Sequence, residues 1–154
     1  MKWLSGIILV LTLSTINSAP APFADEGSLR LPKSSIPTNY DITLWTTVDT
    51  GERKFTGIVK IDIEIKENSD IITLHNRRLD IDYASVKLIN TFTEVEYEIS
   101  VNEDTAREFV FIDSSIRPLV AGENFRVEIS YTGELQLGTS GFYRSSYIES
   151  STTK

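Results

Sequence analysis

The chain has 154 residues and a formal net charge of −7, with 22 acidic against 15 basic side chains. This balance argues against a nucleic-acid-binding protein, which needs a surplus of Lys and Arg gathered on one face. The absence of cysteine excludes disulfides, iron–sulfur clusters and Cys zinc sites, and the single histidine, His75, excludes zinc sites that need two or three imidazoles.

The amino terminus has the features of a secretion signal. Lys2 supplies the positive end, an apolar run follows over 6–13, and small residues stand at Ser18, Ala19 and Ala21. The apolar run is too short to span a bilayer, which takes roughly 20 residues. We therefore expect a secreted, extracellular protein without a membrane span.

A buried amino-terminal helix is the alternative interpretation, but Pro20 and Pro22 would break such a helix at once. We expect the signal peptide to cover residues 1–19, with cleavage between residues 18 and 21. Residues 20–35 are a mixed polar stretch, which predicts an extended leader without a core of its own.

From residue 40 onward, apolar residues recur at every second position, the pattern of strands with one buried face. Four segments show this alternation, at 40–44, 59–66, 94–99 and 125–131. Shorter apolar runs lie at 71–74, 79–83, 86–89 and 109–112. Turn-forming groups separate them, at 49–51, 67–70, 102–104 and 121–124.

About eight short strands with one polar face each predict an all-β fold. The expected architecture is an antiparallel sandwich, or a curved, saddle-like double sheet, over residues 36–147. Residues 148–154 would then form a short tail. No window shows a convincing helical period of 3.6 residues, so we expect no long helix.

The carboxylates are the first candidates for a site. Glu94, Glu96 and Glu98 share one face of an expected strand, as do Asp62 and Glu64, and oxygen ligands of this kind suit calcium. Alternate strand residues lie about 7 Å apart, too far to chelate one ion without help from loops. Solvated strand faces are therefore the favoured interpretation.

His75 could join a serine and an aspartate in a hydrolase triad, but the chain has no G-x-S-x-G motif. The Gly-Thr-Ser-Gly segment at 138–141 has the wrong spacing, which favours a structural or surface histidine. Arg77 and Arg78 are too few to form an anion-binding patch. From the residues alone we assign no catalytic, substrate-binding, metal or cofactor-binding residue.

Four segments carry a family resemblance by their order and spacing. They are L-R-L-P at 29–32 with Pro37 and Y-D-I-T-L at 40–44; F-T-G-I-V-K-I at 55–61; I-I-T-L-H at 71–75 with Leu79; and Y-T-G-E-L at 131–135 leading to G-F-Y-R-S-S-Y at 141–147. Together they resemble the amino-terminal β-domain of the M1 zinc aminopeptidases, the aminopeptidase N group, and in style its insect midgut members.

In that family the zinc-binding H-E-x-x-H helix, the exopeptidase loop and the catalytic tyrosine lie in the following domain. None of these motifs occurs here, so no family site residue can be assigned and we expect no zinc or other cofactor in this chain. Phe142, Tyr143 and Tyr147 are expected to pack at an interdomain surface rather than to contact a ligand.

Two functional hypotheses follow from the resemblance. The chain could be a non-catalytic structural or binding module, whose partners would be a full-length aminopeptidase or a second copy. Alternatively, it could be a fragment of a zinc aminopeptidase that removes amino-terminal residues from peptides; such family members often lie on the outer face of the plasma membrane. A secreted β-sandwich that binds a ligand rests on fold analogy alone.

Overall fold

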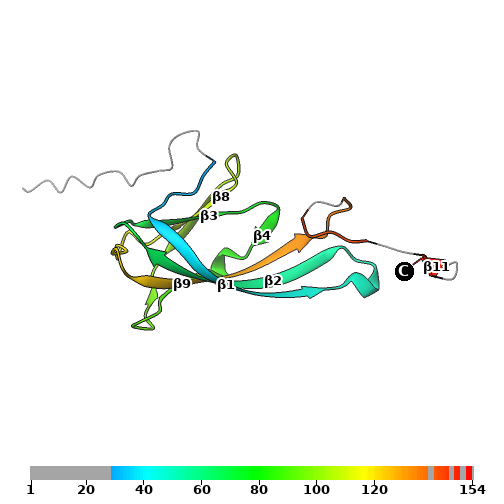
Figure 1. Ribbon diagram of the computed structural model, residues 1–154, viewed down its shortest axis with the longest axis horizontal. Coiled ribbons are helices and arrows are strands. Elements are labelled where there is room, and N and C mark those ends of the chain that lie inside the picture. Colours follow the sequence, from blue (N-terminus) through cyan, green and yellow to red (C-terminus); the bar gives the residue numbers. More distant parts are fainter. Residues whose placement is uncertain (1–28, 139–140, 146–147, 150–151, 154) are drawn as a thin grey trace, which may run out of the picture.

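The computed structural model describes residues 29–138, 141–145, 148–149 and 152–153. The expected signal peptide lies outside the described residues and stays a prediction. Figure 1 shows a large curved sheet with a smaller sheet above one end, so the antiparallel, saddle-like double sheet is confirmed. Among the described residues, no helix has the length and apolar character needed to cross a membrane.

The large sheet has the strand order β1-β2-β9-β5-β6, and β4 pairs with the far end of β9. All these pairs are antiparallel. Their bounds are β1 Ser35–Thr46, β2 Lys54–Ile65, β4 Leu79–Ile81, β5 Lys87–Asn90, β6 Glu96–Tyr97 and β9 Asn124–Glu134.

The small sheet has the order β3-β8-β7, again antiparallel. Its strands are β3 Ile71–His75, β7 Ser100–Asp104 and β8 Phe109–Asp113. Two short 3-10 turns, η1 Val48–Thr50 and η2 Tyr83–Ser85, join strands, and the two-stranded pair β10 Ile148–Glu149 and β11 Thr152–Thr153 follows β9 in sequence.

Period-two alternation explains the long central strands. In β2, Ile61, Ile63 and Ile65 are buried on the face toward the small sheet. Charged residues occupy the other face of the β2–β9 ladder, where Asp62 accepts a 2.8 Å ion-paired hydrogen bond from Arg126. Each strand therefore has one apolar and one charged face, as the sequence predicts.

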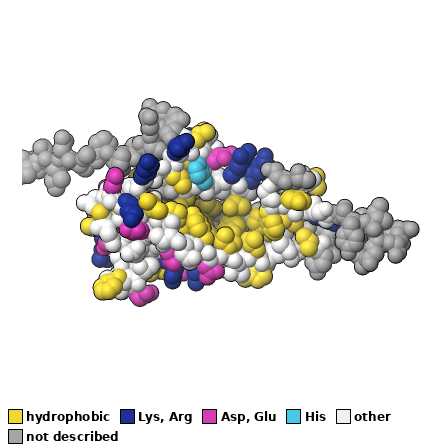
Figure 2. Space-filling view, viewed as in Figure 1, with side chains coloured by type: hydrophobic (Ala, Val, Ile, Leu, Met, Phe, Trp, Pro, Cys, Tyr) yellow, Lys and Arg dark blue, Asp and Glu magenta, His cyan; other side chains and the backbone are white. Residues whose placement is uncertain are grey.

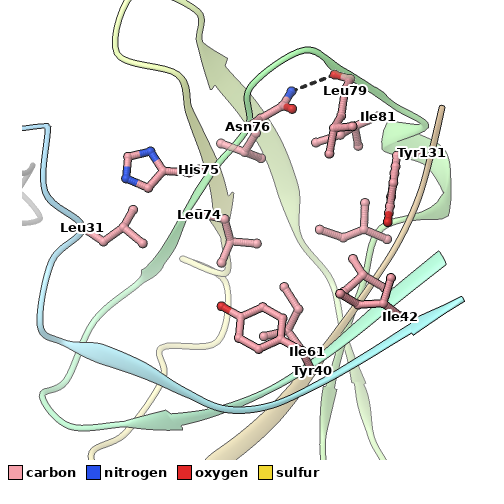
Figure 3. A pocket seen from close by; sticks show the side chains of 13 residues that line it. Leu31, Tyr40, Ile42, Ile61, Leu74, His75, Asn76, Leu79, Ile81 and Tyr131 are labelled. Atoms are coloured by element: carbon pink, nitrogen blue, oxygen red, sulfur yellow. Dashed lines mark hydrogen bonds between the residues drawn. The ribbon is translucent and has the colours of Figure 1, made fainter. Parts of the chain in front are cut away.

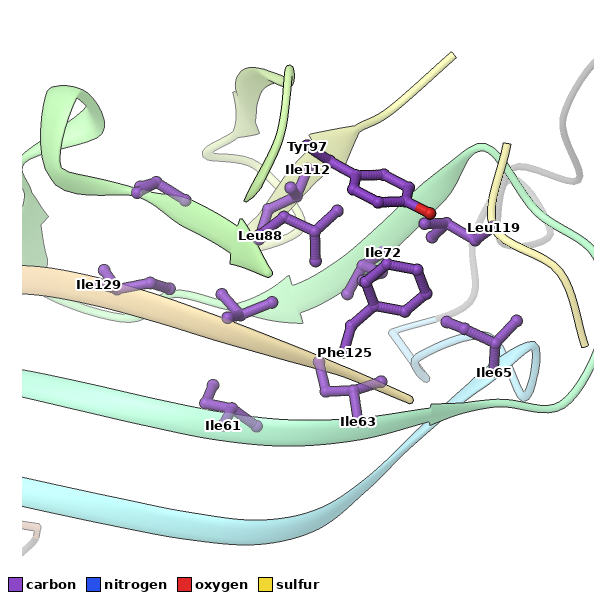
Figure 4. Packing of buried hydrophobic residues seen from close by; sticks show 12 residues of the cluster. Ile61, Ile63, Ile65, Ile72, Leu88, Tyr97, Ile112, Leu119, Phe125 and Ile129 are labelled. Carbon is purple, nitrogen blue, oxygen red and sulfur yellow. The ribbon is translucent and has the colours of Figure 1, made fainter. Parts of the chain in front are cut away.

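The core lies where the small sheet covers the large one, and we call this part the closed end (Figure 4). The ring of Phe125 meets the ring of Tyr97 edge-on, with centroids 5.0 Å apart. Residues fully buried around them come from both sheets and from the segment before β9: Ile63, Ile65, Ile72, Leu88, Ile112, Leu119 and Val127.

The prediction of a strand over 94–99 is largely wrong. Only Glu96–Tyr97 forms a strand, because the Asn90 side chain accepts hydrogen bonds from the backbone N–H groups of Phe92 and Thr93 and holds a turn there. Glu94 then takes a left-handed conformation, with φ of 56°. A local side-chain hydrogen bond has competed successfully with the sheet ladder.

The turn expected at 102–104 is also displaced. Residues 102–104 lie inside β7, and the chain reverses over 105–108 instead. There Asp104 accepts hydrogen bonds from the backbone N–H and the Nε of Arg107, at 3.0 and 2.7 Å. Glu108 completes the reversal in a left-handed conformation, with φ of 59°.

Two of the motifs noted in the sequence pack against each other across β2 and β9. Phe55 lies opposite Gly133, and Gly57 lies opposite Tyr131. Each ring covers the opposing glycine: a Cβ on Gly57 would meet the Tyr131 ring at 2.5 Å, and one on Gly133 would meet the Phe55 ring at 2.4 Å. The two F/Y-x-G motifs are thus reciprocal aromatic–glycine pairs, a known way to cover glycine in a sheet.

Candidate functional site

Beyond the closed end, the described residues cover the inner face of the large sheet only in part. An apolar hollow of about 320 Å³ lies there, and we call it the trough (Figures 2 and 3). It continues the inter-sheet core outward to the surface. Its lining consists of Leu31, Tyr40, Ile42, Val59, Ile61, Leu74, His75, Asn76, Leu79, Ile81, Val110, Ile129 and Tyr131.

Strand β1 forms one wall of the trough. Tyr40 and Ile42 pair with Ile61 and Val59 of β2, so their side chains share the inner face of the sheet. Yet Ile42 is 55% exposed, so the described residues leave more than half of it uncovered. No described strand pairs with the other edge of β1, which makes this wall an open sheet edge as well as an apolar surface.

A polar cluster stands at the opposite rim. Asn76 follows β3, and its Nδ2 donates to the Leu79 carbonyl at 3.0 Å and to Glu103 Oε1 at 2.9 Å. Both partners can only accept, so the amide nitrogen must face them and Oδ1 must face away. Asn76 is 7% exposed, and its Oδ1 is buried without a hydrogen-bond partner.

Two tyrosines have altered acidity near the trough. The Tyr83 hydroxyl donates to the second oxygen of Glu103, and this hydrogen bond raises the pKa of Tyr83 above its usual value. Tyr131 lies in the trough wall, where burial raises its pKa. Both shifts favour the neutral phenol over the phenolate.

The structure places His75 at the trough rim, with its ring tilted against the Phe109 ring at a centroid distance of 4.9 Å. The neighbouring arginines lie on the outside of the same loop. Arg77 pairs with Glu108 at 3.4 Å, and Arg78 Nη1 donates to Gln136 Oε1 at 2.9 Å. These contacts give all three residues a packing or surface role.

The acidic residues do not come together. Glu94 lies in the turn after β5, Glu96 pairs with Lys87 at 3.4 Å, and Asp62 pairs with Arg126. In the described part of the chain, no three His, Asp or Glu residues are grouped closely enough to hold a metal ion. The residues present there do not fit the zinc that the resemblance associates with the whole family.

The aromatic segment after β9 is described only in part. Phe142 packs edge-on against Phe55, with ring centroids 5.1 Å apart, while Phe142 and Tyr143 both stay nearly half exposed. Tyr147 and the Thr139–Ser140 step lie outside the described residues. The expectation that these aromatics face another domain stays a prediction.

Sequence reasoning missed both the trough and the role of Asn76. The alternation over 40–44 shows which side chains point inward, but it does not show whether anything covers them. Asn76 could have been noticed as a polar residue between His75 and the apolar β4. Its importance comes from Glu103, which is 27 positions away in sequence.

Comparison with known proteins identifies relatives over most of the chain. Residues 36–154 match the family described as the peptidase M1 N-terminal domain. Human endoplasmic reticulum aminopeptidase 1 is 28% identical to this chain over 94% of its residues. Rat aminopeptidase N is also 28% identical, over 93% of the chain. Aminopeptidase 2 of Candida albicans is 30% identical over 94% of the chain.

These matches occupy a small part of the relatives. The chain spans 16%, 15% and 14% of the length of the three proteins just named. Apart from Ser35 at the start of β1, the all-β sheets and the reciprocal aromatic–glycine pairs both lie within residues 36–154, the range that the family matches. On that evidence the chain belongs to the family of peptidase M1 N-terminal domains.

Proposed function

We propose that this chain is a non-catalytic docking module of an M1 aminopeptidase, and that the trough is its docking surface. The supporting observation is the trough itself, an apolar extension of the core that lies open at the surface. Contiguous apolar surface of this kind marks an interaction site more often than a free surface. The relatives, which are several times longer than this chain, supply the class of partner.

The proposal includes the absence of peptidase activity in this chain alone. An M1-type reaction needs a water activated at zinc, and the described residues offer no suitable ligand group. The full chain should not hydrolyse leucine p-nitroanilide, with or without added zinc, above the rate of a heat-denatured control. Hydrolysis that follows the protein through purification and requires zinc would contradict this part.

The module would act outside the cytoplasm. Lys2 and the apolar run over 6–13 support export, and one relative is an endoplasmic reticulum aminopeptidase. Expression of the full chain in insect cells should give a secreted product that begins between residues 19 and 22. An intracellular product that retains Lys2 would contradict the proposed location.

The docking surface can be tested with two substitutions on one strand. The full chain is co-expressed with rat aminopeptidase N from which the matched segment has been removed, and association is measured by co-purification. Ile42→Asp places a charge in the trough and should reduce association at least about tenfold, whereas Thr43→Asp on the opposite face should reduce it less than about threefold. Equal effects, or no association, would contradict the proposal.

A small-molecule ligand is the second candidate, because about 320 Å³ falls at the lower end of ligand-pocket sizes. The lining contains no Asp, Glu, Lys or Arg, so such a ligand would be apolar and uncharged. The docking module is favoured because β1 also presents an open edge beside the trough.

A further inference from the structure

The outer face of the large sheet, opposite the trough, has a hollow of its own. We call this hollow the outer pocket, and its volume is about 390 Å³. Tyr131 of β9 lies at its centre and pairs with Gly57 of β2 on one side and with Ile81 of β4 on the other. The side chains of Tyr131 and Ile81 line the trough, so these residues contribute backbone to the floor of the outer pocket. The two hollows therefore lie back to back on one sheet.

A row of side chains from four strands forms one wall of the outer pocket. Trp45 of β1 pairs with Thr56 of β2 (Figure 1). Thr132 of β9 pairs with Thr56 on one side and with Asp80 of β4 on the other. Because neighbouring strands lie about 4.8 Å apart, the backbone positions of Trp45 and Asp80 are about 14 Å apart. The remaining wall consists of Ile58, Ser130 and Asp82.

The polar groups of this row have no partner in the described part of the chain. There the side chains of Thr56, Thr132 and Asp80 make no hydrogen bond or ion pair, and the Trp45 indole N–H makes none either. Trp45 is also 53% exposed, which leaves a large aromatic surface in water. Elsewhere on the same face, opposite charges are paired, as in Lys60–Glu128, Asp62–Arg126 and Lys87–Glu96. The outer pocket thus combines unused hydrogen-bonding groups with an exposed aromatic ring.

These groups match the chemistry of a neutral sugar ring. A pyranose has C–H groups on its faces, which the negative face of an indole attracts, and hydroxyl groups around its edge. The threonine hydroxyls can donate and accept hydrogen bonds, and the carboxylates of Asp80 and Asp82 accept them with the added strength of a charge. One Asp82 oxygen already accepts from the backbone N–H of Ala84 at 3.2 Å, which leaves the second oxygen for a ligand.

Charge and length argue against two other classes of ligand. No Lys, Arg or His lines the outer pocket, so its two carboxylates would repel an anion. A compact ammonium ion must lie within about 6 Å of an aromatic ring centre to gain from it. Asp80 stands at the far end of the row from Trp45, so a small cation would contact only one of them and could not accept from the threonine hydroxyls. A neutral ligand that spans the row uses all of these groups.

We propose that the outer pocket binds a neutral oligosaccharide of about two or three pyranose rings, the length of the row. One ring stacks on Trp45, and hydroxyl groups of the ring at the other end donate to Asp80. The hydroxyls of Thr56 and Thr132 bond the saccharide between these ends. The inference does not depend on docking at the trough, because the two hollows open on opposite faces of the sheet. The domain can therefore hold a saccharide and a protein partner at the same time.

The test follows the NMR spectrum of the isotope-labelled full chain as saccharides are added. Cellotriose and triacetylchitotriose represent polysaccharides, and the pentasaccharide core of N-linked glycans represents glycoproteins. We expect at least one of these probes to bind with a dissociation constant of about 1 mM or below, and the probe that binds identifies the source. The indole N–H resonance of Trp45 and the methyl resonances of Thr56 and Thr132 should shift, whereas the methyl resonances of Ile42 in the trough should not.

Two pairs of substitutions connect binding to the row. Trp45→Ala should weaken binding at least about tenfold, whereas Phe92→Ala, which removes a 94% exposed ring after β5, should change it less than about twofold. Asp80→Asn should weaken binding about fivefold, because a neutral amide oxygen is a weaker acceptor than a carboxylate. Asp41→Asn, on the same face but outside the pocket, is its control and should change binding less than about twofold. All four side chains are exposed, and circular dichroism checks that the variants fold.

Four other results would overturn the inference. The first is that none of the three saccharides binds. The second is binding that shifts the trough methyl groups and leaves the Trp45 resonance unmoved. Spermine that shifts the resonances of the row and displaces a bound saccharide would identify a polyamine site instead. Equal effects of Trp45→Ala and Phe92→Ala, together with equal effects of Asp80→Asn and Asp41→Asn, would place the bound saccharide elsewhere.

Discussion

The two ends of the large sheet use the same sequence pattern and reach different degrees of burial. At the closed end, the inward side chains of β2 and β9 meet the small sheet, and Phe125 is 0% exposed. At the trough, the inward side chains of β1 alternate equally well, yet Tyr40, Ile42 and Leu44 are exposed. Alternation therefore sets the direction of a side chain, and the presence of a second layer sets its burial.

We expect the two ends of the sheet to have different roles, the closed end in stability and the trough in binding. Residues at the closed end hold the domain together, because their burial is complete within the described residues. The exposed trough residues of β1, Tyr40 and Ile42, should contribute less to folding, and under the proposed function they contact the partner. The predictions below test this division by comparing the two ends.

The largest expected effect is at the closed end. Phe125→Ala should lower the free energy of unfolding by about 3–5 kcal/mol, because it opens a cavity beside Tyr97 and Leu88. Tyr40→Ala, in the half-exposed wall of the trough, should cost less than about 1 kcal/mol. Urea unfolding followed by circular dichroism measures both; similar losses would remove the distinction between the two ends.

The aromatic–glycine pairs should give the next largest effect. A Cβ on residue 133 would lie 2.4 Å from the Phe55 ring, so Gly133→Ala would displace that ring. We expect the substitution to lower the free energy of unfolding by about 1–3 kcal/mol. Gly138→Ala has open space around its Cβ and is the matched control, with a change of less than about 0.5 kcal/mol. Thermal unfolding of both variants would show a loss for the first alone.

A smaller effect is expected at alkaline pH near the rim of the trough. The hydrogen bond to Glu103 raises the pKa of Tyr83, so the folded state holds the phenolic proton more tightly than the unfolded state. Its contribution is complete below the usual tyrosine pKa of about 10 and is lost as the pH rises through the higher folded value. Tyr83→Phe should flatten this part of the stability profile, and an unchanged slope above pH 10 would contradict the contact.

The smallest effect is expected at acidic pH in the β7–β8 turn. Hydrogen bonds from Arg107 lower the pKa of Asp104, so the folded state favours the carboxylate. This contribution is present above the usual aspartate pKa of about 4 and is lost as the pH falls through the lower folded value. Asp104→Asn should reduce the stability difference between pH 6 and pH 3 slightly, as measured by urea unfolding at both values.

Much of the fold could be predicted from the sequence. The alternations over 59–66 and 125–131 correspond to β2 and β9. A slip by one residue would turn their charged side chains into the core, so only one register buries the apolar face. The segment 94–99 alternates just as regularly, but the Asn90 side chain holds a competing turn that short-range pattern does not reveal. Local hydrogen bonds of this kind explain why the boundaries of β6 and β7 were missed.

The candidate site was less predictable for a different physical reason. The trough exists because other elements leave part of β1 uncovered. Asn76 Oδ1 lacks a partner because the amide nitrogen turns toward Glu103, which lies on a strand distant in sequence. Neither property is local, so no window of sequence contains it. The family resemblance, by contrast, depends on short motifs, and the structure explains two of them as reciprocal ring-over-glycine pairs.

The most direct test of the account compares the two faces of β1 in the presence of a partner. The chain has no cysteine, so Ile42→Cys and Thr43→Cys each introduce a single thiol, on the trough face and on the opposite face. Both thiols should react with a maleimide at similar rates in the free chain. After co-purification with rat aminopeptidase N that lacks the matched segment, we predict that labelling slows at least about tenfold at position 42 and less than about twofold at position 43. Equal protection of both thiols, or none, would contradict the claim that the trough is the docking surface.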